Sequence, residues 1–190
     1  MSARLRRAAP ILAVSGLSLL AAACGDTSGL PQAQLSNVVD TVSLYALNGT
    51  PISTPSAYVL SGRQAVRTDL SASFDFAFNL DSLERAVLLP TGTVGLGKAS
   101  GLQQASGPFD GVKLAPTGGY LLDQPFRLDS GTVALVRSRP ITNCLFGATV
   151  SLFAKLEVLA IDTTARRIDF KILVDENCGY RGLEPGIPKQ

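Results

Sequence analysis

The chain has 190 residues, of which 46% are hydrophobic and 17% are charged, with a formal net charge of +2 and no histidine. A chain of this length suits one domain with a substantial core. The absence of histidine excludes Ser-His-Asp and Cys-His catalysis, and also metal sites built on histidine.

The first 25 residues have the organisation of an export signal. Three arginines, Arg4, Arg6 and Arg7, precede an apolar run of small residues over positions 10–23, which is too short to span a bilayer comfortably. The run ends in LAAACG, which resembles the bacterial lipoprotein signal, whose cysteine is acylated and becomes the new N-terminus. The resemblance implies lipid attachment at Cys24. The alternatives are ordinary signal cleavage that leaves Cys24 free, or a plain core cysteine.

The same resemblance implies a signal peptide over residues 1–23 and the location. The mixed polar and apolar stretch that follows, with Gly, Ser and Pro, predicts a lipidated tether over 24–37, and the strand pattern after it predicts a single β-domain over 38–190. Acyl chains on Cys24 would anchor the protein to a membrane of the cell envelope, and Gly25 in place of aspartate favours the outer membrane in a cell with two membranes. Cleavage removes three of the 17 basic residues and leaves 14 against 15 acidic ones, so we expect no nucleic acid as a partner.

Short apolar or alternating runs separated by Gly, Pro and Asn predict strands along the rest of the chain. Strands are expected at positions 38–47, 57–60, 64–68, 70–80, 86–89, 120–122, 126–128 and 132–137. Positions 91–106 are rich in Gly and Ser without a period, which indicates an irregular loop.

The segment LSASFDFAFNL has the clearest alternation before the last third of the chain. Phe74, Phe76 and Phe78 fall on one face together with Leu70, while Asp75 falls on the other. Three phenylalanines on one face predict the centre of the core, with Asp75 directed toward solvent.

Two longer alternating runs, within 149–175, predict an antiparallel hairpin. Both apolar faces come to the same side when a three-residue turn is centred on Thr164. This register sets Glu157 opposite Lys171 and leaves Asp175 on the outer face.

Cys144 and Cys178 flank the predicted hairpin and are expected to form a disulfide in an oxidising envelope. The hairpin register, extended, places Cys178 opposite Val150 rather than beside Cys144. The segment that follows Cys144 must therefore fold back for the bridge to form.

Eight to ten short strands with frequent Gly and Pro turns, and no amphipathic helix, predict an all-β fold. The expected architecture is an antiparallel β-sandwich or a small β-barrel.

Positions 92–99, GTVGLGKA, match the Walker A pattern up to its lysine but carry Ala99 in place of the Ser or Thr that binds magnesium. No helix is predicted after it, so the dipole that holds phosphate is missing. We therefore expect no nucleotide.

Paired carboxylates are the remaining route to hydrolysis. The acidic residues fall on expected outer strand faces or in turns, as solvated groups do: Asp75, Asp81, Asp110, Asp162 and Asp169. The sequence therefore predicts a β-domain that is not an enzyme and has no cofactor or metal, and that binds or scaffolds an envelope protein or glycan. The alternative is a carboxylate-dependent hydrolase of envelope glycans.

Overall fold

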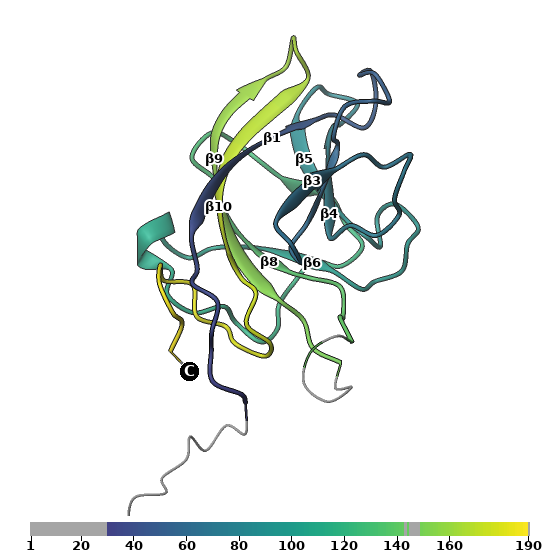
Figure 1. Cartoon of the computed structure of the whole chain (residues 1–190). Helices are drawn as coiled ribbons and strands as arrows, with labels where there is room; N and C mark the ends of the chain where they lie inside the picture. The colour runs from purple at the N-terminus through teal and green to yellow at the C-terminus, as the bar shows by residue number, and fades with distance from the viewer. Residues whose placement is uncertain (1–29, 143, 145–148, 190) are drawn as a thin grey trace, which may run out of the picture.

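The computed structural model describes residues 30–142, 144 and 149–189, which form an antiparallel β-sandwich (Figure 1). The predicted signal peptide and Cys24 lie outside these residues. Among the residues described, no helix is long and apolar enough to cross a membrane.

Ten strands in the described residues form two five-stranded sheets, as the all-β prediction requires. The first sheet has the order β1 (Val39–Tyr45), β10 (Arg167–Asp175), β9 (Phe153–Asp162), β8 (Val133–Arg137), β6 (Gly101–Gln104). The second has the order β3 (Gln64–Val66), β2 (Ala57–Val59), β4 (Phe76–Leu80), β5 (Ala86–Pro90), β7 (Phe126–Arg127). A short 3-10 helix, η1 (Phe109–Gly111), follows β6.

The main core lies between the two sheets. Phe76 of β4 stacks on Tyr58 at 5.6 Å between ring centroids, and both contact the ring of Phe170 from the other sheet. Phe76 and Phe78 are fully buried in this core, so the predicted aromatic face is confirmed for these two residues.

The prediction that residues 70–80 form one strand is wrong for its first half. The strand begins at Phe76 rather than at residue 70, and Leu70 is 73% exposed. Phe74 packs in a separate cluster that also includes Ala77. Asp75 is 2% exposed rather than solvated, because its carboxylate accepts hydrogen bonds from the backbone N–H groups of Leu60 and Arg139.

The β9–β10 hairpin has the predicted pairing through most of its length. Glu157 lies opposite Lys171 and forms an ion pair with it at 2.8 Å. The turn, however, holds four residues, 163–166, with Arg166 at φ +53°. A bulge at Leu159 absorbs the extra residue and restores the predicted register beyond it.

The predicted disulfide between Cys144 and Cys178 is present, with the two Cα atoms 5.5 Å apart. The expected opposition of Val150 and Cys178 is wrong. Val150 instead exchanges two backbone hydrogen bonds with Ile141, at 2.8 and 3.1 Å. The chain before β9 thus pairs with the chain after β8, and this pairing brings Cys144 back toward Cys178.

Both sheets are also covered on their outer faces, which the alternating patterns did not predict. One apolar cluster lies outside β8, β9 and β10, and another lies outside β2, β4 and β5. The Gly-rich region expected to be a loop contributes β6, because Gly101–Gln104 pairs with β8 along its whole length. Positions 120–122 form only a bridge from Leu121 to Leu102.

Candidate ligand-binding site

The outer face of the first sheet carries a row of side chains that point away from the central core. Strand pairing sets Gln103, Leu135, Lys155 and Leu173 side by side across β6, β8, β9 and β10. Leu135, Lys155 and Leu173 are buried. This face is therefore covered by other parts of the chain.

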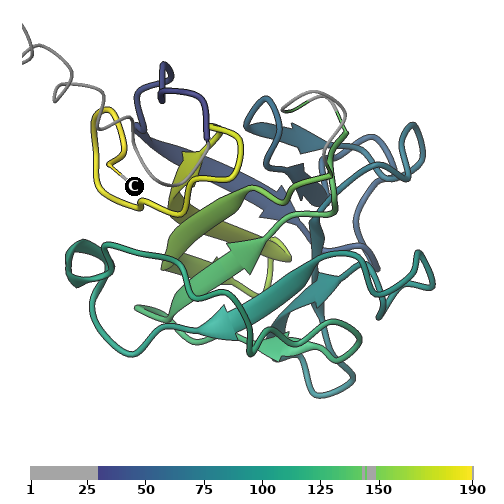
Figure 2. The same ribbon diagram turned by 90° about the horizontal axis from the view of Figure 1, so that it is seen from below.

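Two segments supply the cover: residues 105–122, called the cover segment below, and residues 176–189, the C-terminal tail. Both lie on the same side of the first sheet in the view from below (Figure 2). The Ala115 N–H donates to the Arg181 carbonyl at 2.9 Å, and the Leu183 N–H donates to the Lys113 carbonyl at 2.8 Å. These bonds join the cover segment to the tail as a bridged pair.

Lys155 fastens the cover segment to the sheet. Its side chain is 1% exposed, and its ammonium group donates to the carbonyls of Phe109 at 2.7 Å and Val112 at 2.9 Å. The ammonium groups of Lys155 and Lys171 each lie 4.5 Å from the centroid of the Phe109 ring. Burial lowers the pKa of Lys155, and the nearby charges of Asp110 and Glu184 oppose this shift.

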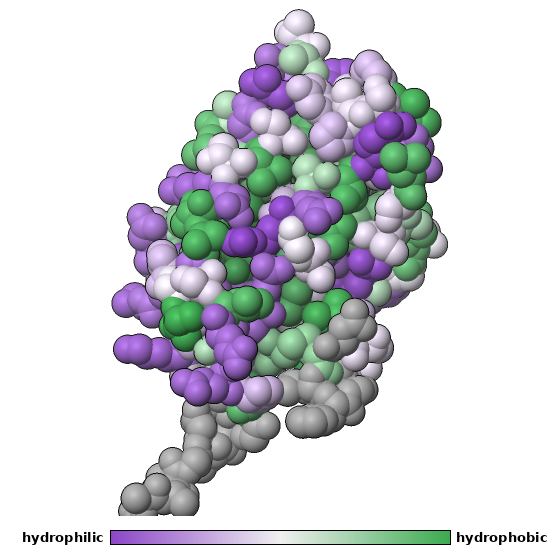
Figure 3. Space-filling model, in the orientation of Figure 1, coloured by the Kyte–Doolittle hydropathy of each residue, from purple (hydrophilic) through white to green (hydrophobic). Residues whose placement is uncertain are grey.

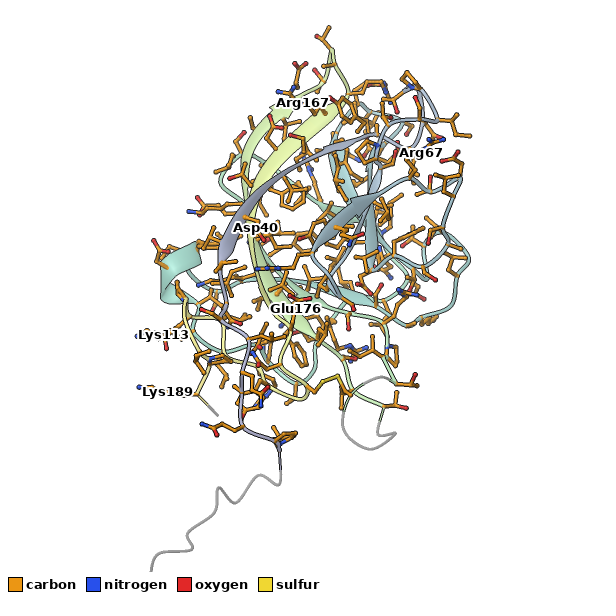
Figure 4. All side chains as sticks on the ribbon, in the orientation of Figure 1. Asp40, Arg67, Lys113, Arg167, Glu176 and Lys189 are labelled. Atoms are coloured by element: carbon orange, nitrogen blue, oxygen red, sulfur yellow. A yellow bond between two sulfur atoms is a disulfide. The ribbon has the colours of Figure 1, made fainter. Side chains whose placement is uncertain are left out.

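A cavity of about 460 Å³ lies between the cover segment, β6, β8 and the tail. Its lining includes Gln103, Gln104, Ser106, Lys113, Leu135 and Arg181. Lys113 projects from the edge of the molecule (Figure 4), and hydrophilic side chains extend along the same edge in Figure 3. A volume of this size is within the range of small-molecule sites, which is about 300–1,000 Å³.

Tyr120 of the cover segment carries a guanidinium group on its ring and feels the charge of a second. Arg137 stacks over its ring at 5.4 Å from the centroid, and its hydroxyl donates to the Pro116 carbonyl at 3.0 Å. Burial raises the pKa of Tyr120 to about 12, although Arg137 and Arg181 both favour its ionised form. The cavity therefore adjoins a region of positive potential.

A smaller cavity of about 270 Å³ lies beside the disulfide. Pro31, Leu35, Glu176, Cys178 and Tyr180 are among its lining residues. This cavity is located where the N-terminal part of the described chain meets the tail.

Most acidic side chains, which were the candidates for a catalytic pair, form ion pairs instead. In the described part of the chain, ten of them do so, among them Asp81 with Arg85 and Asp169 with Arg167. The first cavity has no carboxylate in its lining, and the smaller cavity has only Glu176. Asp175, expected on the outer face, is buried because the tail folds over it.

The segment that resembles a Walker A sequence forms a loop between β5 and β6. The hydroxyl of Thr91 closes it by donating to the Gly97 carbonyl at 2.7 Å and accepting from the N–H groups of Ala99 and Ser100. Lys98 forms an ion pair with Asp123. The loop is followed by strand β6. The expectation that no helix follows is correct, but the strand was not predicted.

Sequence analysis missed the residues of the larger cavity, because they come from three separate parts of the chain, 103–116, Leu135 and Arg181, and belong to no motif. One feature of the sequence did indicate that the outer face of the hairpin is covered. Phe153 and Leu173 occupy the face of the hairpin expected to be polar, and large apolar residues on a polar face indicate that something covers it. Both are buried in the outer cluster.

In the described part of the chain, no group of three or more acidic or cysteine side chains gathers in a way that could hold a metal ion. Comparisons with protein-family models, with curated proteins and with solved structures find no match to this chain.

Proposed function

We propose that this chain is an exported lipoprotein, held at an envelope membrane by acyl chains on Cys24, whose β-sandwich is a non-catalytic binding module. The observation that carries the proposal is the way in which the N-terminal segment is attached to the domain. Only residues 25–29 separate Cys24 from the described chain, so this attachment would set how the domain sits on a membrane.

Residues 30–37, called the entry segment, are fastened by two asparagines. The Asn177 side chain accepts from the N–H groups of Gln34 and Leu35, both at 2.9 Å, and donates to the Leu35 carbonyl at 2.8 Å. Asn37 donates to the carbonyls of Gly182 at 2.8 Å and Glu184 at 3.2 Å. The last part of the predicted tether is therefore held against the C-terminal tail.

This attachment defines two ends of the molecule. The entry segment and the tail lie at one end, and the tip of the β9–β10 hairpin lies at the other (Figure 1). On a lipid anchor the entry end would face the membrane and the hairpin tip would point away from it.

Binding is favoured over hydrolysis by the state of the carboxylates. A glycosidase needs two carboxyl groups about 5–10 Å apart across its substrate site. Neither cavity described here offers two, and ion pairing occupies most of the remaining acidic side chains.

The anchor is tested by Cys24→Ser with Ser28→Ala as a neighbouring control. Labelled palmitate should be incorporated into the wild type and the control but not into Cys24→Ser, which should leave the membrane fraction. Incorporation into Cys24→Ser would refute the anchor.

Binding is tested by using the purified lipidated protein to capture material from envelope extracts. We expect one glycan or protein to be retained in a saturable manner and released unchanged. Chemical conversion of the retained material would contradict a non-catalytic role.

A further inference from the structure

Positive charge without a carboxylate partner gathers around the cover segment. In the described chain, Arg137, Lys155 and Arg181 have no carboxylate within ion-pair distance, whereas basic residues elsewhere are mostly paired. Lys155 donates to the cover segment, Arg137 stacks over the ring of Tyr120, and Arg181 donates to the Ala115 carbonyl. Three cations that form no ion pair thus lie on one side of one sheet, and the nearby Asp110 and Glu184 charges act on Lys155 alone among them. The two arginines therefore attract a negative ligand.

The cavity provides directed groups for such a ligand. Arg181 and Lys113 line it, and Arg181 uses one of its guanidinium nitrogens on the Ala115 carbonyl at 2.9 Å. The rest of the planar guanidinium retains the geometry that binds a carboxylate with two parallel hydrogen bonds. Lys113 is paired only with exposed Glu184, at 3.1 Å, and an exposed pair of this kind is weak.

The uncharged polar groups of the lining indicate a ligand that carries hydroxyl groups as well as a negative charge. The Gln103 side-chain oxygen is buried and has no hydrogen-bond partner among the residues described. A buried acceptor without a donor is costly by about 1–3 kcal/mol, so a ligand hydroxyl placed there would remove that cost. Gln104 and Ser106 add further amide and hydroxyl groups.

The remaining lining is largely apolar. Pro108, Pro116 and Leu135 contribute to the cavity, and their carbon surfaces suit the C–H face of a sugar. Simple inorganic anions would leave this surface and the amides unused.

We infer that this cavity binds an acidic sugar of the uronic-acid type, with its carboxylate on Arg181 and Lys113 and a hydroxyl donating to Gln103. This inference rests on the proposed binding function and names the ligand class for it. The envelope glycan partner would thus be an acidic one.

The probes are galacturonate, neutral galactose and acetate, titrated into the purified lipidated protein in detergent micelles by calorimetry. Galacturonate should bind in a saturable manner, and both galactose and acetate should bind at least about tenfold more weakly. Equal binding of acetate would reduce the site to a simple anion site and overturn the sugar assignment. Equal binding of galactose would overturn the role of the charge.

Variants locate the site. Gln103→Glu adds a negative charge with little change of shape and should abolish galacturonate binding. Lys113→Gln and Arg181→Gln should each weaken it about tenfold or more, and Lys98→Gln, an ion-paired surface lysine on another loop, should leave it unchanged. Unfolding curves like those of the wild type would confirm that the variants fold.

Unchanged galacturonate affinity in both Gln103→Glu and Lys113→Gln would overturn the assignment of the cavity. Absence of galacturonate binding to the wild type would overturn the inference on its own. The proposed function would survive that result if capture from envelope extracts persists, and would fail separately if capture is absent.

Discussion

Lys155 shows how a charged residue can serve as a structural fastener. An ammonium group is costly to bury unless its donors are satisfied, and here two backbone carbonyls and an aromatic face receive it. Since it joins β9 to the η1 turn, it fixes the position of the cover segment over the sheet.

Replacing Lys155 by methionine should therefore lower the stability of the fold. The change leaves the Phe109 and Val112 carbonyls without their donor, and each buried unsatisfied group costs about 1–3 kcal/mol. Urea unfolding measures the loss. Lys98→Met, an exposed ion-paired lysine, should cost about 0–1 kcal/mol. An equal effect of the two changes would contradict the fastening role.

Asp175 predicts a pH dependence of stability. Burial raises its pKa, and the amide groups of Asn177 and Gly182 only partly oppose this. An acid with a raised folded-state pKa binds more protons when folded, so its contribution to stability is present at low pH and is lost as pH rises above the ordinary Asp range through the raised value.

Asp175→Asn removes this titration while its side-chain oxygen can still accept from Asn177. The free energy of unfolding of the variant should therefore increase relative to that of the wild type as pH rises from about 3 to 7, because only the wild type loses the contribution of Asp175 over this range. Denaturant unfolding across this range provides the comparison. Parallel pH profiles would show that Asp175 does not titrate in the manner described.

At the scale of elements, the ring of Phe76 in β4 contacts the opposite sheet at Phe170. Phe76→Ala should destabilise the protein by about 3–5 kcal/mol, because the ring is buried between Tyr58 and Phe170. Leu70→Ala, in the exposed segment before the strand, should cost less than about 0.5 kcal/mol. Thermal and urea unfolding of the two variants test this contrast, and a clear destabilisation by both changes would indicate one continuous strand from residue 70.

The disulfide ties the end of the hairpin to the chain that follows β8. It closes a separation of 34 residues, and loop entropy predicts a loss of about 3–4 kcal/mol when it is removed. The Cys144→Ser, Cys178→Ser double variant should have an unfolding free energy lower by this amount, as measured by denaturant unfolding. The reduced wild type should have the same stability as this variant. A reduced wild type as stable as the oxidised protein would exclude a stabilising role.

Sequence patterns located most strands, because apolar and polar residues alternate wherever one face of a strand packs in the main core. The same patterns gave wrong burial for side chains on the opposite face where other segments cover it. Lys155, Asp75 and Asp175 read as solvated polar positions, yet the cover segment, the β2–β3 turn and the C-terminal tail bury them. β6 was missed because Gly101–Gln104 has little propensity of its own and becomes a strand only through pairing with β8. The cavity could not be predicted because its residues meet only after the chain has folded.

At the scale of the whole molecule, the positions of the two ends predict an orientation on membranes. A fluorophore at Gln34→Cys, in the entry segment, should be quenched by a quencher carried on lipid headgroups. One at Thr164→Cys should be quenched much less, because β9 and its turn extend about 30 Å along the domain. Cys24→Ser should abolish quenching at both sites, and equal quenching in the anchored protein would contradict the orientation.

The entry segment continues directly into β1, and this has a mechanical consequence. β1 runs from the entry end toward the hairpin tip and pairs with β10 over seven residues, from Val39 to Tyr45. A pull on the N-terminus away from the domain therefore acts along β1, perpendicular to hydrogen bonds that must then break together rather than one at a time. The asparagine contacts of the entry segment would yield first, and the sheet behind them would resist in shear. A domain tethered in this way would keep its fold under tension between a membrane and whatever it holds.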